Sequence, residues 1–143
     1  GGLEFQLAFT HLGVPHGVLF LDQSPFLDLN KAVEDLADTY GPVIEKHPAF
    51  PQGTNVNFVS VQDGNHLHVT TWERGAGRTL ACGTGACASA ACYRALRNGG
   101  DRITVDMPGG TVIISVDADE ILTMEGRARR ICTGEYEEEG IEV

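Results

Sequence analysis

A chain of 143 residues is long enough for one domain with a substantial core and too short for two. Its formal net charge of −10 argues against nucleic acid as a partner, because phosphate binding needs clustered Lys and Arg. No apolar run approaches the roughly 20 residues that span a bilayer, so we expect no membrane contact. Much of the negative charge lies in the C-terminal tail, which we expect to be solvated (Glu135, Glu137, Glu138, Glu139 and Glu142).

The N-terminal part of the chain carries none of the marks of a signal peptide, and we interpret the sequence as beginning partway through a longer product. Hydrophobic patterning then predicts strands, a helix that ends at Gly41-Pro42, and a hairpin. The predicted elements are strands 3–9 and 18–21, a helix over 31–40, and strands 55–61 and 66–72 joined by the turn at 62–65.

A glycine-rich stretch over 73–85 is followed by a predicted helix that runs to about Leu96. Short strands are predicted after it, over 103–107, 112–116, 121–125 and 129–136. Seven or eight short strands with two helices predict an α+β domain with a strongly curved or closed, mostly antiparallel sheet.

The helix that follows Cys82 has an unusual composition. From Gly83 to Cys92 it contains no charged and no large side chain. A surface helix shows a polar stripe opposite its apolar one, so a helix without a polar face is buried on all sides. Small residues also let neighbouring backbone approach closely. We therefore expect a central buried helix with the curled sheet around it.

The chain has four cysteines, of which three lie in this helical segment. Their spacing matches neither a disulfide framework nor a zinc knuckle, and it favours free thiols in a reducing cytoplasm. We interpret Cys87 and Cys92 as small core residues, and Cys132 as a structural residue of the last predicted strand.

Cys82 stands where the helix begins, and a helix N-terminus lowers the pKa of a thiol. Gly83 and Gly85 leave backbone N–H groups accessible, and with the Thr84 hydroxyl they can hold a substrate carboxylate. An anion site beside a mobile proton suits proton abstraction at a carbon next to a carboxylate. The competing interpretation, a packed core helix without chemistry, explains residues 86–92 but not the glycine-rich stretch.

Gly75 and Gly77 permit a tight loop that brings Glu73 and Arg74 back toward the thiol. The whole run from Glu73 to Ala86 resembles the second catalytic motif of the diaminopimelate epimerase family. Four further motifs of that family occur in its order and approximate spacing: Gly13-Val-Pro-His16, Phe50-Pro-Gln-Gly-Thr-Asn-Val-Asn-Phe58, Trp72-Glu-Arg74 and Met107-Pro-Gly-Gly110.

This resemblance implies a cofactor-independent epimerase that inverts one α-carbon of diaminopimelate, between its LL and meso forms, with two cysteines on opposite faces. Such enzymes supply lysine and cell-wall precursors. The family has two similar halves, each a curled sheet around a central helix, with the active site between them. The first half carries a Cys-Gly-Asn-Gly motif that this sequence lacks. Residues 1–143 therefore resemble one domain, the C-terminal half, whose partners are an amino-acid substrate and the missing N-terminal half. A homodimer is also open to it.

The resemblance also assigns roles. Cys82 matches the proton donor and acceptor of this half, and His16 and Glu73 match residues that tune the thiol pKa. The positions that match substrate-binding residues are Asn55, Glu73, Arg74, Gly83 and Thr84. The resemblance implies neither a cofactor nor a metal.

Two positions depart from the family pattern. Val14 replaces a common asparagine that contacts the substrate, so that role is not carried over. Arg78 replaces a common glutamate, and it adds positive charge near the thiol or points to solvent. The Val14 departure keeps a second hypothesis open, a related racemase for proline, hydroxyproline or another amino acid. A third hypothesis is that the chain alone is a folded module without turnover.

Overall fold

The computed structural model describes residues 4–136. It contains an eight-stranded mixed sheet in the order β1-β2-β3-β4-β6-β7-β8, with the short β5 paired to β4. The elements in chain order are β1 (Ala8–His11), β2 (Pro15–Phe20), a 3-10 turn η1 (Leu21–Gln23), α1 (Val33–Glu45), β3 (Asn55–Val61), β4 (His66–Glu73), β5 (Gly77–Arg78), α2 (Gly83–Arg97), β6 (Arg102–Met107), β7 (Gly110–Val116) and β8 (Leu122–Gly126).

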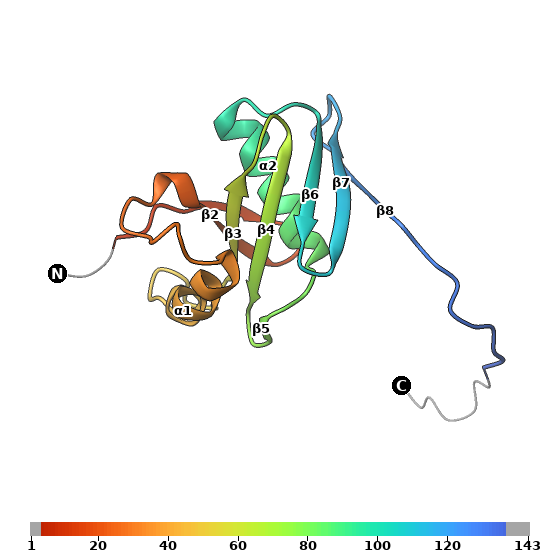
Figure 1. The fold of residues 1–143 in the computed structure, drawn as a ribbon, viewed down its shortest axis with the longest axis horizontal. Helices are drawn as coiled ribbons and strands as arrows, with labels where there is room; N and C mark the ends of the chain where they lie inside the picture. The colour runs from red at the N-terminus through yellow and green to blue at the C-terminus, as the bar shows by residue number, and fades with distance from the viewer. Residues whose placement is uncertain (1–3, 137–143) are drawn as a thin grey trace.

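The sheet curls around α2. This one helix contacts β1, β2, β3, β4, β6, β7 and β8, which a flat sheet of this width could not allow. Only the β2–β3 and β4–β6 pairs are parallel, and the other pairs are antiparallel. In Figure 1, α2 runs behind the strands, whereas α1 packs on β3, β4 and β5 at the lower left. The prediction of a curled, mostly antiparallel sheet around a central helix is confirmed.

Strand alternation divides the apolar side chains into two cores. Val59 on β3 belongs to the core around α2, whereas its neighbour Phe58 belongs to the core beneath α1. Val18 and Leu19 on β2 divide in the same way. Successive residues of a strand point to opposite faces, so β2 and β3 are buried on both sides. Within residues 4–136, neither helix has the length and apolar character needed to cross a bilayer.

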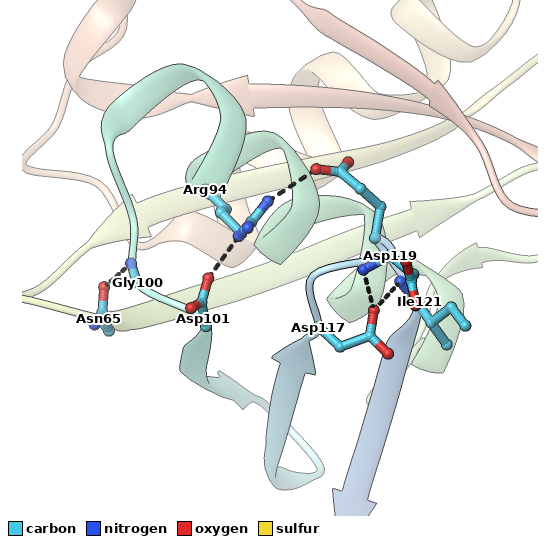
Figure 2. A network of polar contacts seen from close by, with 8 residues as sticks. Asn65, Arg94, Gly100, Asp101, Asp117, Asp119 and Ile121 are labelled. Atoms are coloured by element: carbon cyan, nitrogen blue, oxygen red, sulfur yellow. Dashed lines mark hydrogen bonds and ion pairs between the residues drawn. The ribbon is translucent and has the colours of Figure 1, made fainter.

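The centre of α2 is as closely enclosed as its composition predicts. Ala86, Ala88 and Ala90 are all 0% exposed. Ion pairs lie at the far end of the helix, where Figure 2 shows Arg94 and Asp101 in contact. The Arg94 guanidinium lies 2.9 Å from the Asp101 carboxylate and 3.1 Å from that of Glu120. These ion pairs hold the last turns of α2 to the loops that flank β6 and β7.

Helix α1 does not end at Gly41-Pro42, as the sequence analysis predicts, but continues to Glu45. The glycine serves another purpose, since a Cβ at Gly41 would lie 2.5 Å from the indole ring of Trp72. Glu45 in the last turn accepts a hydrogen bond of 2.8 Å from Trp72 Nε1. Tertiary packing against Trp72 therefore carries the helix past a residue pair that ordinarily terminates one.

The strand predictions near the N-terminus need correction. Strand β1 begins at Ala8 rather than Leu3, which lies outside the described residues. Strand β2 begins at Pro15, so it includes His16, and Leu21 opens the 3-10 turn instead of closing the strand. The short strand β5 was not predicted.

No strand forms over 129–136, so that prediction is wrong. In Figure 1 the chain after β8 runs away from the sheet, and no strand within residues 4–136 pairs with it. Ile131 is 94% exposed and Cys132 is exposed too, which contradicts a buried structural role for this cysteine. Glu135 is exposed as expected, and the other four tail glutamates lie outside the described residues.

Gly41→Ala tests the contact with Trp72. If Gly41 were an ordinary helix position, alanine would stabilise the chain by roughly 1 kcal/mol through its higher helix propensity. We expect the opposite sign, a loss of about 1–3 kcal/mol, because the new methyl group overlaps the indole ring. Urea unfolding measures the difference. Gly126→Ala is the matched control, since its Cβ would meet Val112 at an ordinary 3.6 Å. A stabilised Gly41→Ala variant contradicts this packing.

Candidate active site

Cys82 is the N-cap residue of α2. Its backbone is extended (φ −135°, ψ 106°), and its sulfur accepts a hydrogen bond of 3.3 Å from the N–H of Gly85. The residue is 8% exposed, so the sulfur lies at the inner edge of the site. Capping by the sulfur satisfies one of the free donors of the first turn and fixes the thiol at the positive end of the helix.

Two N–H groups of that first turn stay available. Within residues 4–136, the N–H groups of Gly83 and Thr84 donate to no protein acceptor, because the first backbone bond of the helix runs from Ala86 to Cys82. A helix N-terminus with unpaired N–H groups binds anions. The predicted carboxylate-binding position is therefore adjacent to the thiol.

His16 lies beside the same turn. Its Nε2 is 3.0 Å from the Thr84 hydroxyl, and that hydroxyl is 3.6 Å from the sulfur of Cys82. The distance along the chain between His16 and Thr84 is 68 residues. The structure thus brings together three of the residues that the sequence analysis selected.

His16, Thr84 and Cys82 form a polar cluster with two more buried residues, which the sequence analysis did not select. Asn57 on β3 and Thr71 on β4 are cross-strand partners, and their side chains are joined by a hydrogen bond of 2.9 Å. The Asn57 amide nitrogen also lies 3.1 Å from His16 Nδ1 and 3.1 Å from the carbonyl oxygen of Gly17. Asn57 is 0% exposed and lies between Val56 and Phe58, and a polar amide between two apolar residues of a strand was the signal that could have identified it.

Gly85 lets the helix approach this polar row. A Cβ on Gly85 would lie 2.5 Å from Asn57 Oδ1 and 2.9 Å from Thr71 Oγ1. The second glycine of the motif is therefore needed for close packing between the helix and the sheet as well as for access to the backbone.

Glu73 is the last residue of β4, and Arg74 follows it. A carboxylate oxygen of Glu73 accepts a hydrogen bond of 2.7 Å from Thr79. The N–H of Arg74 donates to Asn55 Oδ1 over 2.8 Å, and its guanidinium donates to the carbonyl oxygen of Gln52 over 2.9 Å. The charge of Glu73 acts on the Cys82 thiol, whereas the side chain of Arg74 is held on the neighbouring loop.

Glu45, another residue that the sequence analysis missed, holds this loop from α1. One carboxylate oxygen accepts from Trp72 Nε1 and the other accepts from the N–H of Gly75 over 3.1 Å. Gly75 and Gly77 adopt positive φ angles of 79° and 81°, which glycine tolerates without strain. The predicted tight turn is confirmed.

Burial raises the pKa of the Cys82 thiol, and the nearby negative charge of Glu73 raises it further, while hydrogen bonds from Thr84 and Gly85 oppose that shift. The sequence analysis expected the helix N-terminus to lower the pKa of Cys82. That expectation is wrong, because the effect of desolvation is larger than that of the local hydrogen-bond donors. Burial also lowers the pKa of His16, against the opposing charge of Glu73.

The structure also places Arg78 and the other cysteines of α2. Arg78 pairs with Asp38 at 2.8 Å, so its charge is directed to α1 rather than to the thiol. Cys92 is buried as predicted, and burial raises its pKa to about 11. Cys87 is half-buried and packs against the α2 core. Among residues 4–136, no three His, Cys, Asp or Glu side chains form a group that could hold a metal ion.

Comparison with known proteins places this site in context. The family model described as diaminopimelate epimerase matches residues 8–131. A diaminopimelate epimerase from Bacillus licheniformis is 43% identical over 140 residues, which cover 95% of this chain and 46% of that protein. One from Natranaerobius thermophilus is 45% identical and covers 92% of this chain and 42% of that protein. The chain thus spans about half the length of the curated relatives it matches.

Solved structures support the fold alone. A phenazine biosynthesis PhzC/PhzF protein from Clostridium difficile superposes with a TM-score of 0.50 at 16% identity, covering 80% of this chain and 40% of that one. A PhzF-family protein from Bacillus anthracis has the same TM-score and identity and covers 84% of this chain and 38% of that one.

Glu73→Gln tests the electrostatics of the site. Removing the negative charge that disfavours the thiolate should lower the pKa of Cys82. The pH dependence of iodoacetamide alkylation measures it, with the modified cysteine identified by peptide mass spectrometry. Glu135→Gln removes an equal charge from the exposed tail and should leave the profile unchanged. An unchanged profile in Glu73→Gln shows that Glu73 does not act on the sulfur.

Proposed function

The chain belongs to the diaminopimelate epimerase family, and on this premise we propose that it forms the C-terminal half of a cofactor-independent epimerase that interconverts LL- and meso-diaminopimelate. In that enzyme Cys82 is one of two thiols that act on opposite faces of the substrate α-carbon. The observation that carries the proposal is the sulfur of Cys82 at the start of α2, beside two unpaired N–H groups.

The proposed reaction begins with the α-carboxylate of the substrate at the N–H groups of Gly83 and Thr84. For one stereoisomer, the Cys82 thiolate takes the α-proton, so that the C–H bond breaks and an S–H bond forms. The electron pair left on carbon spreads into the carboxylate, where fixed N–H donors stabilise the growing negative charge. The thiol on the other face then gives its proton to the carbon, which inverts the centre. For the other stereoisomer the two thiols exchange roles.

His16, Glu73 and the substrate-facing residues complete the proposed site. Glu73 acts on the sulfur through its charge and His16 acts on it through Thr84, and together they set its protonation in this proposal. Asn55 holds the N–H of Arg74, which supports a role for this pair in positioning the remainder of the substrate. The proposed metabolic role, in lysine and cell-wall precursor synthesis, places the enzyme in the cytoplasm.

The second base belongs to a partner domain in this proposal. The chain covers 46% of its Bacillus licheniformis relative, which leaves room for an N-terminal half with its own cysteine. Apolar side chains also surround the site without cover, since Leu80 is 67% exposed and Met124, next to Gly83, is 50% exposed. Closure by a second domain over these residues would exclude water from the reacting carbon.

Cys82→Ala in the two-domain protein should lower epimerisation by about 10²–10⁴-fold, because it removes a proton carrier. Exchange of the α-hydrogen in deuterated water, followed by stereoisomer analysis, measures the effect. Cys87→Ala, at a half-buried cysteine one and a half turns along the same helix, should keep near-normal activity. Undiminished epimerisation by Cys82→Ala refutes the assignment. Turnover of proline or another amino acid in place of diaminopimelate would support the racemase alternative instead.

The 143-residue chain by itself should show no measurable epimerisation, because one thiol cannot serve both faces of a carbon. Activity is expected only when the other half is supplied in the same chain or added separately. Efficient turnover by the isolated chain would contradict the half-site proposal while leaving the role of Cys82 open to the previous experiment.

A further inference from the structure

We propose that Asn57 is a positioning residue, which holds His16 as the neutral tautomer that carries its proton on Nε2. Asn57 was not among the residues selected from the sequence, and its side chain does not reach the thiol itself. It acts through contacts that determine which partner donates in each hydrogen bond of the cluster.

The orientation of the Asn57 amide follows from its neighbours. A backbone carbonyl can only accept, so the contact of 3.1 Å with the Gly17 oxygen requires the amide nitrogen on that side. The amide oxygen then faces Thr71, whose hydroxyl donates to it over 2.9 Å. All of these groups are buried, where an unpaired polar atom is costly, so the reversed amide is disfavoured.

The amide nitrogen has a second hydrogen, which points to His16 Nδ1 at 3.1 Å. A donor at this distance requires a lone pair on Nδ1, so the ring proton must lie on Nε2. A doubly protonated ring would oppose N–H to N–H at the same contact. Burial, which lowers the pKa of His16, acts in the same direction.

The tautomer of His16 determines whether Thr84 donates a hydrogen bond to the sulfur or accepts one from it. With its proton on Nε2, His16 donates to the Thr84 oxygen over 3.0 Å, and the Thr84 hydroxyl hydrogen is free to point at Cys82. The sulfur then accepts from Thr84 and from the N–H of Gly85, which favours the thiolate. With the opposite tautomer, Thr84 would donate to the ring and accept from the thiol, which favours S–H.

Other titratable groups also face this pair. In the described part of the chain they are Glu73 from β4 and His11 from β1, which act on His16, and Cys87 from α2, which lies near Cys82. None of them bonds to His16 Nδ1, so Asn57 is the group that selects the tautomer.

The inference deepens the proposed function, because its catalytic meaning rests on Cys82 being a reacting thiol. The assignment of the His16 tautomer does not depend on that function, and it can be measured without substrate. Failure of one proposal can therefore be distinguished from failure of the other.

The primary test is nitrogen-15 NMR of the histidine rings in the 143-residue chain at neutral pH, with His16 assigned through a His16→Gln variant. We expect an unprotonated, pyridine-type Nδ1 and a protonated, pyrrole-type Nε2. A proton on Nδ1, a mixture of tautomers or a charged ring overturns the proposal. This reading uses the unsubstituted chain, so it does not depend on the folding of any variant at Asn57.

Asn57→Asp provides the second test, because a carboxylate of nearly the same shape accepts where the amide nitrogen donates. We expect a protonated, pyrrole-type Nδ1 in place of the unprotonated one, because the carboxylate accepts a hydrogen bond from that nitrogen. Thr71→Val is the matched control: it removes the donor to the amide oxygen but leaves Gly17 to orient Asn57, so the Nε2 proton should be retained. An unchanged tautomer in folded Asn57→Asp also overturns the proposal.

Discussion

Much of this structure depends on the pairing of polar groups inside a curled sheet. His16, Asn57 and Thr71 lie on three adjacent strands and face the first turn of α2, where water cannot reach them. Leaving a buried polar group unpaired costs roughly 1–3 kcal/mol, so each must find its partner within the protein. The register of β2, β3 and β4 and the position of the helix are thereby coupled, and Gly85 is the residue whose small size permits the approach.

The same contacts bury the Cys82 thiol and also supply it with hydrogen-bond donors. A sulfur at a helix N-terminus receives local donors, but the sheet that closes around α2 also removes water, and desolvation has the larger effect on its pKa. Burial therefore favours the protonated thiol, and the donors from Thr84 and Gly85 oppose that preference. Hydrogen bonds that Thr84 and Gly85 donate to the sulfur favour the thiolate, whereas a hydrogen bond that the thiol donates to Thr84 favours the protonated form.

Much of the organisation was predictable because its causes are local. An uncharged run of small residues predicted a buried central helix, and the alternation over 55–61 predicted β3 with its observed bounds. Prediction failed where distant residues decide. Gly41 is a typical stop signal, but it packs on Trp72 and the helix continues. The pattern over 129–136 resembles a strand, yet no strand of the described part of the chain pairs with it.

The amino-acid sequence was enough to predict a cysteine at the start of a buried helix, next to free backbone donors, because capping, glycine conformation and helix composition are properties of neighbouring residues. It also determined membership in the diaminopimelate epimerase family. The direction of the Cys82 pKa shift and the partner that orients His16 could be recognised only in the folded chain. Both depend on side chains contributed by separate strands, and burial and hydrogen-bond direction exist only once those strands have met.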